Sequence, residues 1–241
     1  MENYREFFIE YLKKQGLHTP QIEAAFEMYS TELQLANQFV NLFSRQMRVE
    51  EIWGKHFIDS VSIFEVYNDF AGKRILDFGT GGGVPGIPIK IIQPDCSFIL
   101  LDSTKKKIET LRNIVQDLKL TNVECLAERI EDREMDAYNG TFDIIVSRGV
   151  RITPTFNDAF KRLLKPDGKV LLYKANINEN TMSDKPTKPA KKERKYITTS
   201  TTIQHSRRRL VEDLSFLKNI KIHKLALDIL GERKIIEINY E

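Results

Sequence analysis

Cysteine is scarce in this sequence, which contains Cys96 and Cys125 and no others among its 241 residues. Two cysteines cannot form a disulfide framework or a cysteine-ligated metal site, so we expect both to be reduced structural residues and expect no bound metal. Long apolar runs are lacking as well, because no stretch approaches the roughly 20 apolar residues that cross a bilayer. We therefore exclude a disulfide-rich secreted scaffold and a membrane-spanning protein.

Neither the net charge nor the N-terminus indicates a special class of protein. The 37 basic residues nearly balance the 34 acidic ones, and a net charge of +3 does not by itself indicate nucleic-acid binding. The opening residues MENYREFFIEYLKK mix charged and apolar side chains, so they do not predict a signal peptide. We expect a cytoplasmic protein whose 241 residues form one main domain with a sizeable core.

Glycine and proline are rare over residues 3–67, where apolar residues recur at helical spacing. This pattern predicts two to four helices, the second of them long. Thr19 followed by Pro20 suits an N-cap and a first helical position, and Gly16 suits the end of the preceding helix. The sequence therefore predicts an N-terminal helical subdomain over residues 1–70.

Short apolar runs begin near Arg74 and alternate with segments long enough for helices. The runs are RILDFG, SFILLD, NVECLA, FDIIVS and KVLLYK. Such spacing is typical of βα units that build a parallel sheet with buried strands. Between the second and third runs, one apolar stripe at helical spacing comprises Ile108, Leu111, Ile114, Val115 and Leu118. The last stretch, IKIHKLALDILGERKIIEINY, predicts two strands with a turn near Gly231, closing an α/β domain over residues 71–241.

Residues 176–209 differ in composition from the rest of the chain. Prolines, threonines and basic residues dominate, as in MSDKPTKPAKKERKYITTSTT, and this composition predicts a mobile loop. Within 185–209 a single acid, Glu193, accompanies the basic residues Lys185, Lys188, Lys191, Lys192, Arg194, Lys195, Arg207, Arg208 and Arg209. Such a run can neutralise RNA phosphates without reading sequence, or it can be a solvated loop.

A glycine-rich stretch, DFGTGGGVPG, follows the first predicted strand from Asp77 to Gly86. Glycines let the backbone turn tightly and approach a ligand, while a helix beginning near Pro85 directs its positive end toward that ligand. The next strand ends at Asp102, whose carboxylate can accept hydrogen bonds from both ribose hydroxyls of an adenosine. Each feature alone is often structural, but together in one βαβ unit they predict a nucleoside cofactor.

The spacing of the glycines separates two classes of nucleoside-binding protein. Dinucleotide-binding folds favour G-x-G-x-x-G, whose third glycine permits close helix packing. Here Val84 follows Gly83 and the pattern continues as G-x-G-x-G-x-P-G, opened by an acidic residue. That form is seen in class I methyltransferases, so an oxidoreductase is the weaker alternative.

Further motifs extend the likeness well beyond this loop. The loop reads DFGTGGGVPGIPI, and LLDSTKKK, LKLTNVE, ERIED and FDIIVSRGV follow it in that order. Upstream, NQFVNL contains Asn37 and Asn41, and GKHFIDSV contains His56, Asp59 and Ser60. Over about residues 30–175 the chain thus resembles the bacterial small-subunit ribosomal RNA guanine-N7 methyltransferases, also called the glucose-inhibited division protein B family.

The sequence departs from that family's pattern at four positions. Ala36 stands where a tryptophan is usual, and Phe43 where a threonine is usual. Gly149 replaces an alanine and Ala175 replaces a glycine. Because the C-terminal third matches poorly, fewer residues support the RNA substrate than support the cofactor.

The resemblance implies a Rossmann-like class I methyltransferase sheet with helices on both faces and an N-terminal helical extension. It also implies S-adenosyl-L-methionine as the cofactor and N7 of a guanine in small-subunit (16S) ribosomal RNA as the methyl acceptor. The substrate would be either naked RNA or an assembling small subunit. We further expect a monomer without a membrane or metal partner.

The resemblance assigns cofactor contacts to matching positions of this chain. They are Gly79, Val84, Ile130, Glu131 and Arg148, and we add Gly81, Asp102 and Ser103 from the glycine-rich loop and the end of the next strand. Ile130 can lie against the adenine ring, whereas Glu131 could equally begin a surface helix. Arg148 ends a strand, where open α/β sheets place their ligands, and could face the methionine carboxylate, the RNA or a surface carboxylate.

Methyl transfer to guanine N7 needs no general base, because N7 already carries an in-plane lone pair and no proton. Catalysis then rests on desolvation and on holding N7 at attack distance, so we assign no catalytic acid or base. His56 and Asp59 could position the guanine or could be cap and packing residues. Lys105, Lys106 and Lys107 would add positive charge beside Asp102 if they point outward.

Two other classes of function stay open at this stage. One is a methyltransferase for another RNA, a protein or a small molecule, and the protein and small-molecule cases are favoured if the basic segment 185–209 can be deleted without loss of activity. A non-catalytic RNA-binding relative would keep the fold but would not bind the cofactor, and calorimetry with S-adenosylmethionine separates it from the enzymes.

Overall fold

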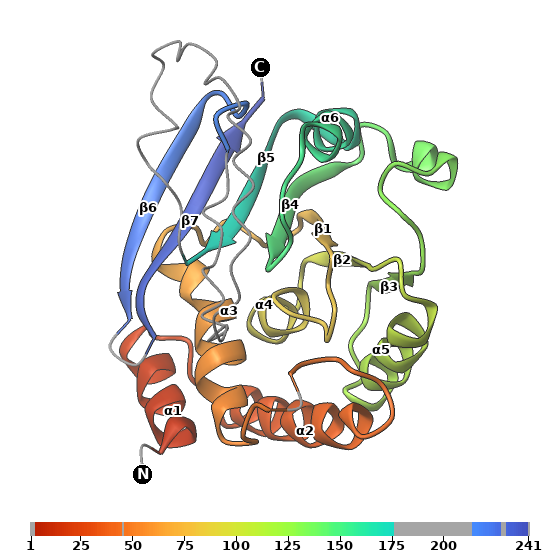
Figure 1. The fold of residues 1–241 in the computed structure, drawn as a ribbon. Coiled ribbons are helices and arrows are strands. Elements are labelled where there is room, and N and C mark those ends of the chain that lie inside the picture. The colour runs from red at the N-terminus through yellow and green to blue at the C-terminus, as the bar shows by residue number, and fades with distance from the viewer. Residues whose placement is uncertain (1–2, 45, 176–213, 228–229, 241) are drawn as a thin grey trace, which may run out of the picture.

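The computed structural model describes residues 3–44, 46–175, 214–227 and 230–240. Its strands are β1 (Arg74–Phe78), β2 (Ser97–Leu101), β3 (Val123–Leu126), β4 (Phe142–Arg148), β5 (Leu164–Lys174), β6 (Ile220–Leu227) and β7 (Gly231–Asn239). They form one seven-stranded sheet in the order β3-β2-β1-β4-β5-β7-β6 (Figure 1). The first five strands are parallel to one another, and β7 is antiparallel to both β5 and β6.

The helices of the described residues fall before and between these strands. They are α1 (Tyr4–Lys14), α2 (Pro20–Asn37), α3 (Asp59–Val61), α4 (Gly86–Ile92), α5 (Lys105–Asp117) and α6 (Pro154–Leu163). A π-helical turn η1 (Trp53–Ile58) and a 3-10 turn η2 (Ser62–Glu65) continue α3 on both sides, and a further 3-10 turn is η3 (Arg133–Tyr138). The Thr19 hydroxyl accepts a hydrogen bond from Ile22 N at 3.1 Å, which confirms the predicted start of α2.

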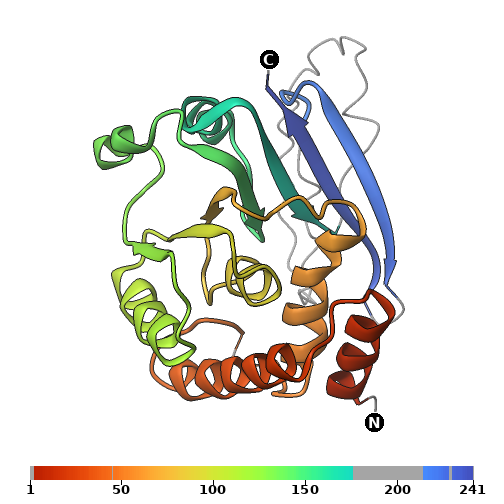
Figure 2. The ribbon, with the colours of Figure 1, turned by 180° about the vertical axis from the view of Figure 1, so that it is seen from behind.

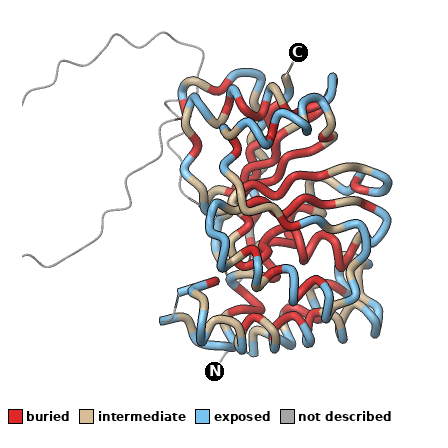
Figure 3. The backbone as a smooth tube through the Cα atoms, turned by 90° about the vertical axis from the view of Figure 1, so that its right-hand side faces the viewer, coloured by how far each residue is buried: buried red, intermediate tan, exposed pale blue. Residues whose placement is uncertain are grey.

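Successive side chains along each strand point to opposite faces of the sheet, so the core is divided between the two faces. In β1, Ile75 belongs to the apolar cluster that includes α2, α4 and α5, whereas the next residue, Leu76, belongs to the cluster that includes α6. Figure 3 shows the strands as an almost continuously buried layer. Because strand residues one position apart point to opposite faces, both faces need a cover. The predicted α/β sheet with helices on both faces is therefore confirmed.

The N-terminal helices lie on the side of the sheet that α4 and α5 cover. Helix α2 runs beneath α4 and α5, as Figures 1 and 2 show from opposite sides. Phe8, Phe26 and Phe57 join α1, α2 and η1, with ring centroids 4.7 Å to 5.9 Å apart. These rings belong to the same apolar cluster as the strands. A separate subdomain over residues 1–70 stays a prediction.

The C-terminal hairpin has the predicted turn, because Leu227 of β6 pairs with Gly231 of β7. The predicted basic loop, residues 176–209, lies outside the described residues. Among the helices that the structure does describe, none combines the length and apolar character needed to cross a bilayer.

Candidate functional site

The glycine-rich loop leaves β1 at the carboxyl end of the parallel strands. Gly79, Gly81 and Gly83 have φ values of +74°, +57° and +93°, in the left-handed region that other residues rarely adopt. Gly79 N donates a hydrogen bond to Leu101 O at 2.9 Å, which ties the loop to the end of β2. A Cβ on Gly79 would lie 2.3 Å from Val150 Cγ2, so a side chain cannot replace its hydrogen without movement.

Asp77, at the start of the loop, is hydrogen-bonded to the middle and to the end of the loop. Its Oδ2 accepts hydrogen bonds from Thr80 Oγ1 at 2.7 Å and from Gly86 N at 2.9 Å, while its buried Oδ1 has no partner among the described residues. Burial raises the pKa of Asp77 to about 7, against the lowering effect of these two hydrogen bonds. We expected the first N–H groups of α4 to face a ligand, but Gly86 N is occupied by this carboxylate.

Tyr29 of α2 fixes the loop from the side of the N-terminal helices. Its side chain is fully buried, and its hydroxyl donates a hydrogen bond to Gly82 O at 2.7 Å. The sequence offered no signal for this contact, because 53 positions separate the two residues.

We expect Tyr29→Phe to lower the free energy of unfolding by about 1–2 kcal/mol, because a buried carbonyl loses its donor. Urea unfolding followed by circular dichroism measures the change. Tyr67→Phe is the matched control, since the Tyr67 hydroxyl donates to Asp69 O at 3.0 Å in an exposed position. An equal loss in both variants would show that the Tyr29 bond does not brace the loop.

A cavity of about 220 Å³ lies beside the loop at the carboxyl ends of β1 and β2. Its lining includes five of the predicted cofactor residues: Gly79, Asp102, Ser103, Ile130 and Glu131. The rest of the lining consists of Phe78, Leu101, Glu128, Arg129, Val150 and Phe156. The cavity thus brings together one acidic side chain at the end of β2 and an apolar wall, which suits a ribose next to a planar base.

Asp102 is held in a fixed orientation by its backbone neighbours. Its Oδ2 accepts from Gly81 N at 3.1 Å, and its Oδ1 accepts from Thr104 N at 2.9 Å. Lys107 Nζ lies 3.4 Å from Oδ2. The carboxylate is 10% exposed, so it is oriented before any ligand arrives and still borders the cavity. Of the three predicted lysines, Lys107 therefore faces the acid, whereas Lys105 and Lys106 are exposed.

Gly81 and Val84, also predicted cofactor residues, do not line this cavity. Gly81 acts on it through the N–H that orients Asp102. Val84 is 8% exposed and packs in the apolar cluster shared with the N-terminal helices. Their assignment as direct cofactor contacts stays a prediction.

Arg148 lies outside the cavity and joins the two other residues that we considered for substrate positioning. Its Nη1 donates to Asp59 Oδ2 at 2.9 Å, and its Nη2 donates to His56 Nδ1 at 2.6 Å. Arg233 Nε donates to the second oxygen of Asp59 at 3.2 Å. The cluster therefore ties β4 and β7 to the helical run before β1. A surface ion pair was one of the alternatives for Arg148. The structure has the ion pair with Asp59, but the Arg148 side chain is only 15% exposed.

His56 is neutral at physiological pH in this cluster. Burial and then the positive charge of Arg148 lower its pKa from 6.5 to about 3. Because Arg148 donates to Nδ1, the ring hydrogen resides on Nε2, which is buried without a partner among the described residues. A histidine in this state does not serve as a general acid or base near pH 7.

We expect acidification from pH 7.5 to pH 5 to destabilise the wild-type chain by about 2 kcal/mol more than a His56→Asn variant. Between pH 3 and pH 6.5 the unfolded histidine binds a proton that the folded one does not, so the free energy of unfolding decreases as the pH falls. Asparagine keeps an acceptor for Arg148 and does not titrate. Asp77, whose folded pKa is raised, has the opposite pH dependence, but it is present in both chains and cancels in the difference. Urea unfolding of both chains at both pH values measures this difference. Equal losses of unfolding free energy in the two chains would contradict the buried neutral state of His56.

Glu131 is exposed and does not begin a helix, since η3 starts at Arg133. Nearby, Glu128, Asp132 and Glu134 bring carboxylate oxygens within 4.8 Å of one another. Exposed acidic groups commonly approach in this way without an ion, and the predicted absence of a metal stays a prediction.

Sequence reasoning predicted Ile130 but missed the rest of the apolar wall of the cavity. Phe78 and Val150 lie inside the quoted motifs, so their positions beside Gly79 could have been noticed. Phe156 had no signal of its own, because it belongs to the first turn of α6 and reaches the site by packing 4.9 Å from the Phe78 ring.

Comparisons with known proteins agree with this geometry. A sequence model of the family described as rRNA small subunit methyltransferase G matches residues 22–211. Ribosomal RNA small subunit methyltransferase G of Lachnoclostridium phytofermentans is 37% identical over 172 residues, which are 70% of each chain. The protein of the same name from Desulfitobacterium hafniense is 38% identical over 162 residues, which are 66% of each chain.

A solved structure shares the fold over most of the chain. It is a SAM-dependent methyltransferase from Aquifex aeolicus, with a TM-score of 0.51 and 13% sequence identity. The match covers 87% of this chain and 98% of that one. At this identity the match concerns the fold alone, and it supports the class I methyltransferase sheet. On the sequence match over residues 22–211, the chain belongs to the rRNA small subunit methyltransferase G family.

Proposed function

We propose that this chain transfers a methyl group from S-adenosyl-L-methionine to N7 of a guanine in small-subunit (16S) ribosomal RNA. The observation that carries the proposal is the cavity at the ends of β1 and β2, which is lined by five predicted cofactor residues. The family resemblance marks three of them, Gly79, Ile130 and Glu131. The relatives reported above are named as small-subunit ribosomal RNA methyltransferases, which supports this substrate class.

The residues present fit the adenosine part of the cofactor. Asp102 offers carboxylate oxygens for ribose hydroxyls, and the buried side chain of Ile130 offers an apolar surface for adenine. Gly79 lines the cavity next to Val150, and a Cβ at Gly79 would meet the Val150 side chain, so glycine fits there without movement. When bound, the cofactor supplies an electrophilic methyl group on a sulfonium. The chain's part is to bind, to orient and to exclude water.

No proton has to be taken from the acceptor nitrogen, and the cluster at Arg148 agrees with that requirement. His56 is neutral and hydrogen-bonded at Nδ1, and Asp59 is shared by two arginines. We propose that this cluster holds the helical run that contains His56 against β4 so that a guanine can be presented to the methyl group. Rate acceleration then comes from proximity and desolvation.

The test is methylation of RNA prepared from cells that lack the modification. Purified chain, radiolabelled S-adenosylmethionine and either naked 16S rRNA or small subunits are incubated, and nucleosides are separated by mass spectrometry. We expect label in 7-methylguanosine alone. Label in another nucleoside, or none while calorimetry shows cofactor binding, would overturn the substrate assignment. Comparing the two RNA forms tells which is preferred.

The oligomeric state and the location of the chain in the cell are part of the same proposal. We propose that the chain acts as a monomer in the cytoplasm, where small subunits assemble. Light scattering of the purified chain at micromolar concentration checks the first part, because a dimer would double the measured mass.

A further inference from the structure

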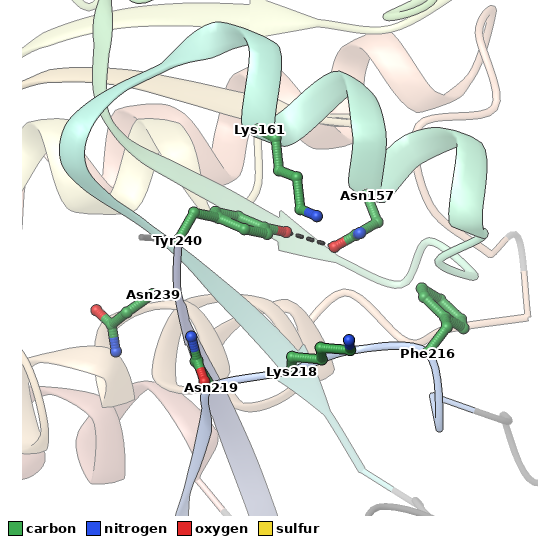
Figure 4. A pocket seen from close by; sticks show the side chains of 7 residues that line it. All are labelled: Asn157, Lys161, Phe216, Lys218, Asn219, Asn239 and Tyr240. Carbon is green, nitrogen blue, oxygen red and sulfur yellow. Dashed lines mark hydrogen bonds between the residues drawn. The ribbon is translucent and has the colours of Figure 1, made fainter.

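A second cavity, of about 210 Å³, lies on the α6 side of the sheet and takes no part in the cofactor site. It is formed by α6, by residues 216–219 before β6, and by the end of β7 (Figure 4). Its lining comprises Asn157, Lys161, Phe216, Lys218, Asn219, Asn239 and Tyr240. We propose that this cavity binds a nucleotide unit of the RNA substrate, away from the guanine that is methylated. The proposal deepens the proposed function and rests on it.

The charge of the cavity favours an anion. Lys161 and Lys218 are the charged residues of its lining, and neither has a carboxylate partner among the described residues. In Figure 4, Lys161 extends from α6 toward the cavity, and Lys218 lies on its other side. No acidic residue in the described part of the chain lines the cavity, although burial and then the nearby Asp158 carboxylate raise the pKa of Tyr240. Two ammonium groups placed in this way suit a phosphate.

The polar groups of the cavity favour a nucleotide over a simple anion. Asn157 is 8% exposed, and its Oδ1 accepts a hydrogen bond from the Tyr240 hydroxyl at 2.6 Å. Its Nδ2 makes no hydrogen bond among the residues that the structure describes, so two donors remain for a ligand. Asn219 and Asn239 add amide groups, which offer the donor and acceptor pairs that base edges and ribose need.

Aromatic rings border the same space. Lys161 Nζ lies 5.6 Å from the centroid of the Tyr240 ring, and the half-buried Phe216 lies at the other side of the cavity. Stacking of bases on such rings, beside cations that hold the backbone, is the common way in which proteins bind single-stranded RNA. An acidic peptide would use the lysines but would leave the rings and the amides without partners.

The two cavities are neighbours through α6. Phe156 lines the cofactor cavity, and the next residue, Asn157, lines this one. Lys161 lies five residues beyond Phe156, which is about 8 Å along a helix. An RNA strand that follows α6 from the carboxyl ends of the parallel strands toward their amino ends would reach both cavities, and the second cavity would add affinity without touching the reacting atoms.

The experiment compares Lys161→Ala/Lys218→Ala with Lys13→Ala/Lys14→Ala, which removes the same charge from the exposed end of α1. Binding of fluorescent 16S rRNA is measured against salt concentration. Two lost phosphate contacts should reduce the salt slope by about 1.4 and weaken binding about 25-fold at 0.1 M salt, with the control unchanged. In methylation assays KM should rise and kcat should stay the same. Equal behaviour of the two double variants would overturn the proposal.

Asn157→Asp adds a test that does not depend on lysines. It keeps an acceptor for the Tyr240 hydroxyl but replaces the Nδ2 donors with negative charge, so RNA binding should weaken while the melting temperature holds. Poly-glutamate is the comparison probe, because it is a polyanion without bases or ribose. If the variant loses poly-glutamate binding and RNA binding equally, the cavity is only a charged patch and the proposed nucleotide site is refuted. Guanosine monophosphate separates a free-nucleotide site from an RNA site, because only the former binds it at micromolar concentration. Should the wild-type chain fail to methylate RNA, the binding assays would still decide this proposal.

Discussion

Replacing Asp102 with alanine is expected to weaken S-adenosylmethionine binding about 100-fold. Two hydrogen bonds from ribose hydroxyls to a charged acceptor contribute about 1.5 kcal/mol each, and 3 kcal/mol corresponds to about two orders of magnitude in Kd. The backbone N–H groups of Gly81 and Thr104 already hold the carboxylate in place, so binding does not have to order it. Isothermal titration calorimetry measures the change.

Loss of a structural role must be separated from loss of the ribose contact. Asp102→Asn keeps an oxygen that can accept from Thr104 N and keeps the size of the side chain, but it lacks the charge and one acceptor. We expect it to fall between wild type and alanine in affinity, and urea unfolding of each variant measures the part of the loss that comes from the lost hydrogen bond from Gly81 N. Asp117→Ala, at the exposed end of α5, is the control for the change in charge. Unchanged cofactor affinity in Asp102→Ala would contradict the ribose role.

The sheet was predictable because its signals are local. The strands that begin at Arg74 and Ser97 are short apolar runs in the sequence. The start of α2 is determined by the neighbouring residues Thr19 and Pro20. The two nucleoside signals, Gly79 and Asp102, then meet because the carboxyl ends of neighbouring parallel strands lie at one edge of a sheet.

The side-chain partners across long sequence separations were not predictable. Arg148 and His56 are 92 positions apart, and no local pattern says that β4 ends beside the helical run before β1. The same applies to Tyr29, whose hydroxyl reaches Gly82 only because α2 packs beneath the loop. Local spacing thus predicted five of the residues that line the cavity at the ends of β1 and β2, whereas the rest of its wall and the contacts that hold these residues depend on tertiary packing.

Gly86→Ala is expected to lower the free energy of unfolding by about 3 kcal/mol, although Gly86 does not line the cofactor cavity. A Cβ at this position would lie 2.6 Å from Leu100 Cδ2 and 2.7 Å from Asp77 Oδ2. It would also lie 3.1 Å from Asp77 Cβ, which belongs to the buried strand β1 and has no free space to enter. Helix α4 would have to move away from β1, which would break the hydrogen bond from Gly86 N to Asp77.

Gly82→Ala in the same loop is the matched control. Its φ is not left-handed, and its Cβ would meet Leu42 and Leu33 at 3.4 Å to 3.5 Å, which is ordinary contact, so we expect a change of less than about 1 kcal/mol. Urea unfolding of both variants, with cofactor affinity measured in parallel, separates two explanations for the glycines. If Gly86→Ala is much the less stable variant, glycine is needed there for close packing of α4 on the sheet. Equal losses would instead assign its effect to backbone freedom in the loop and contradict the packing argument.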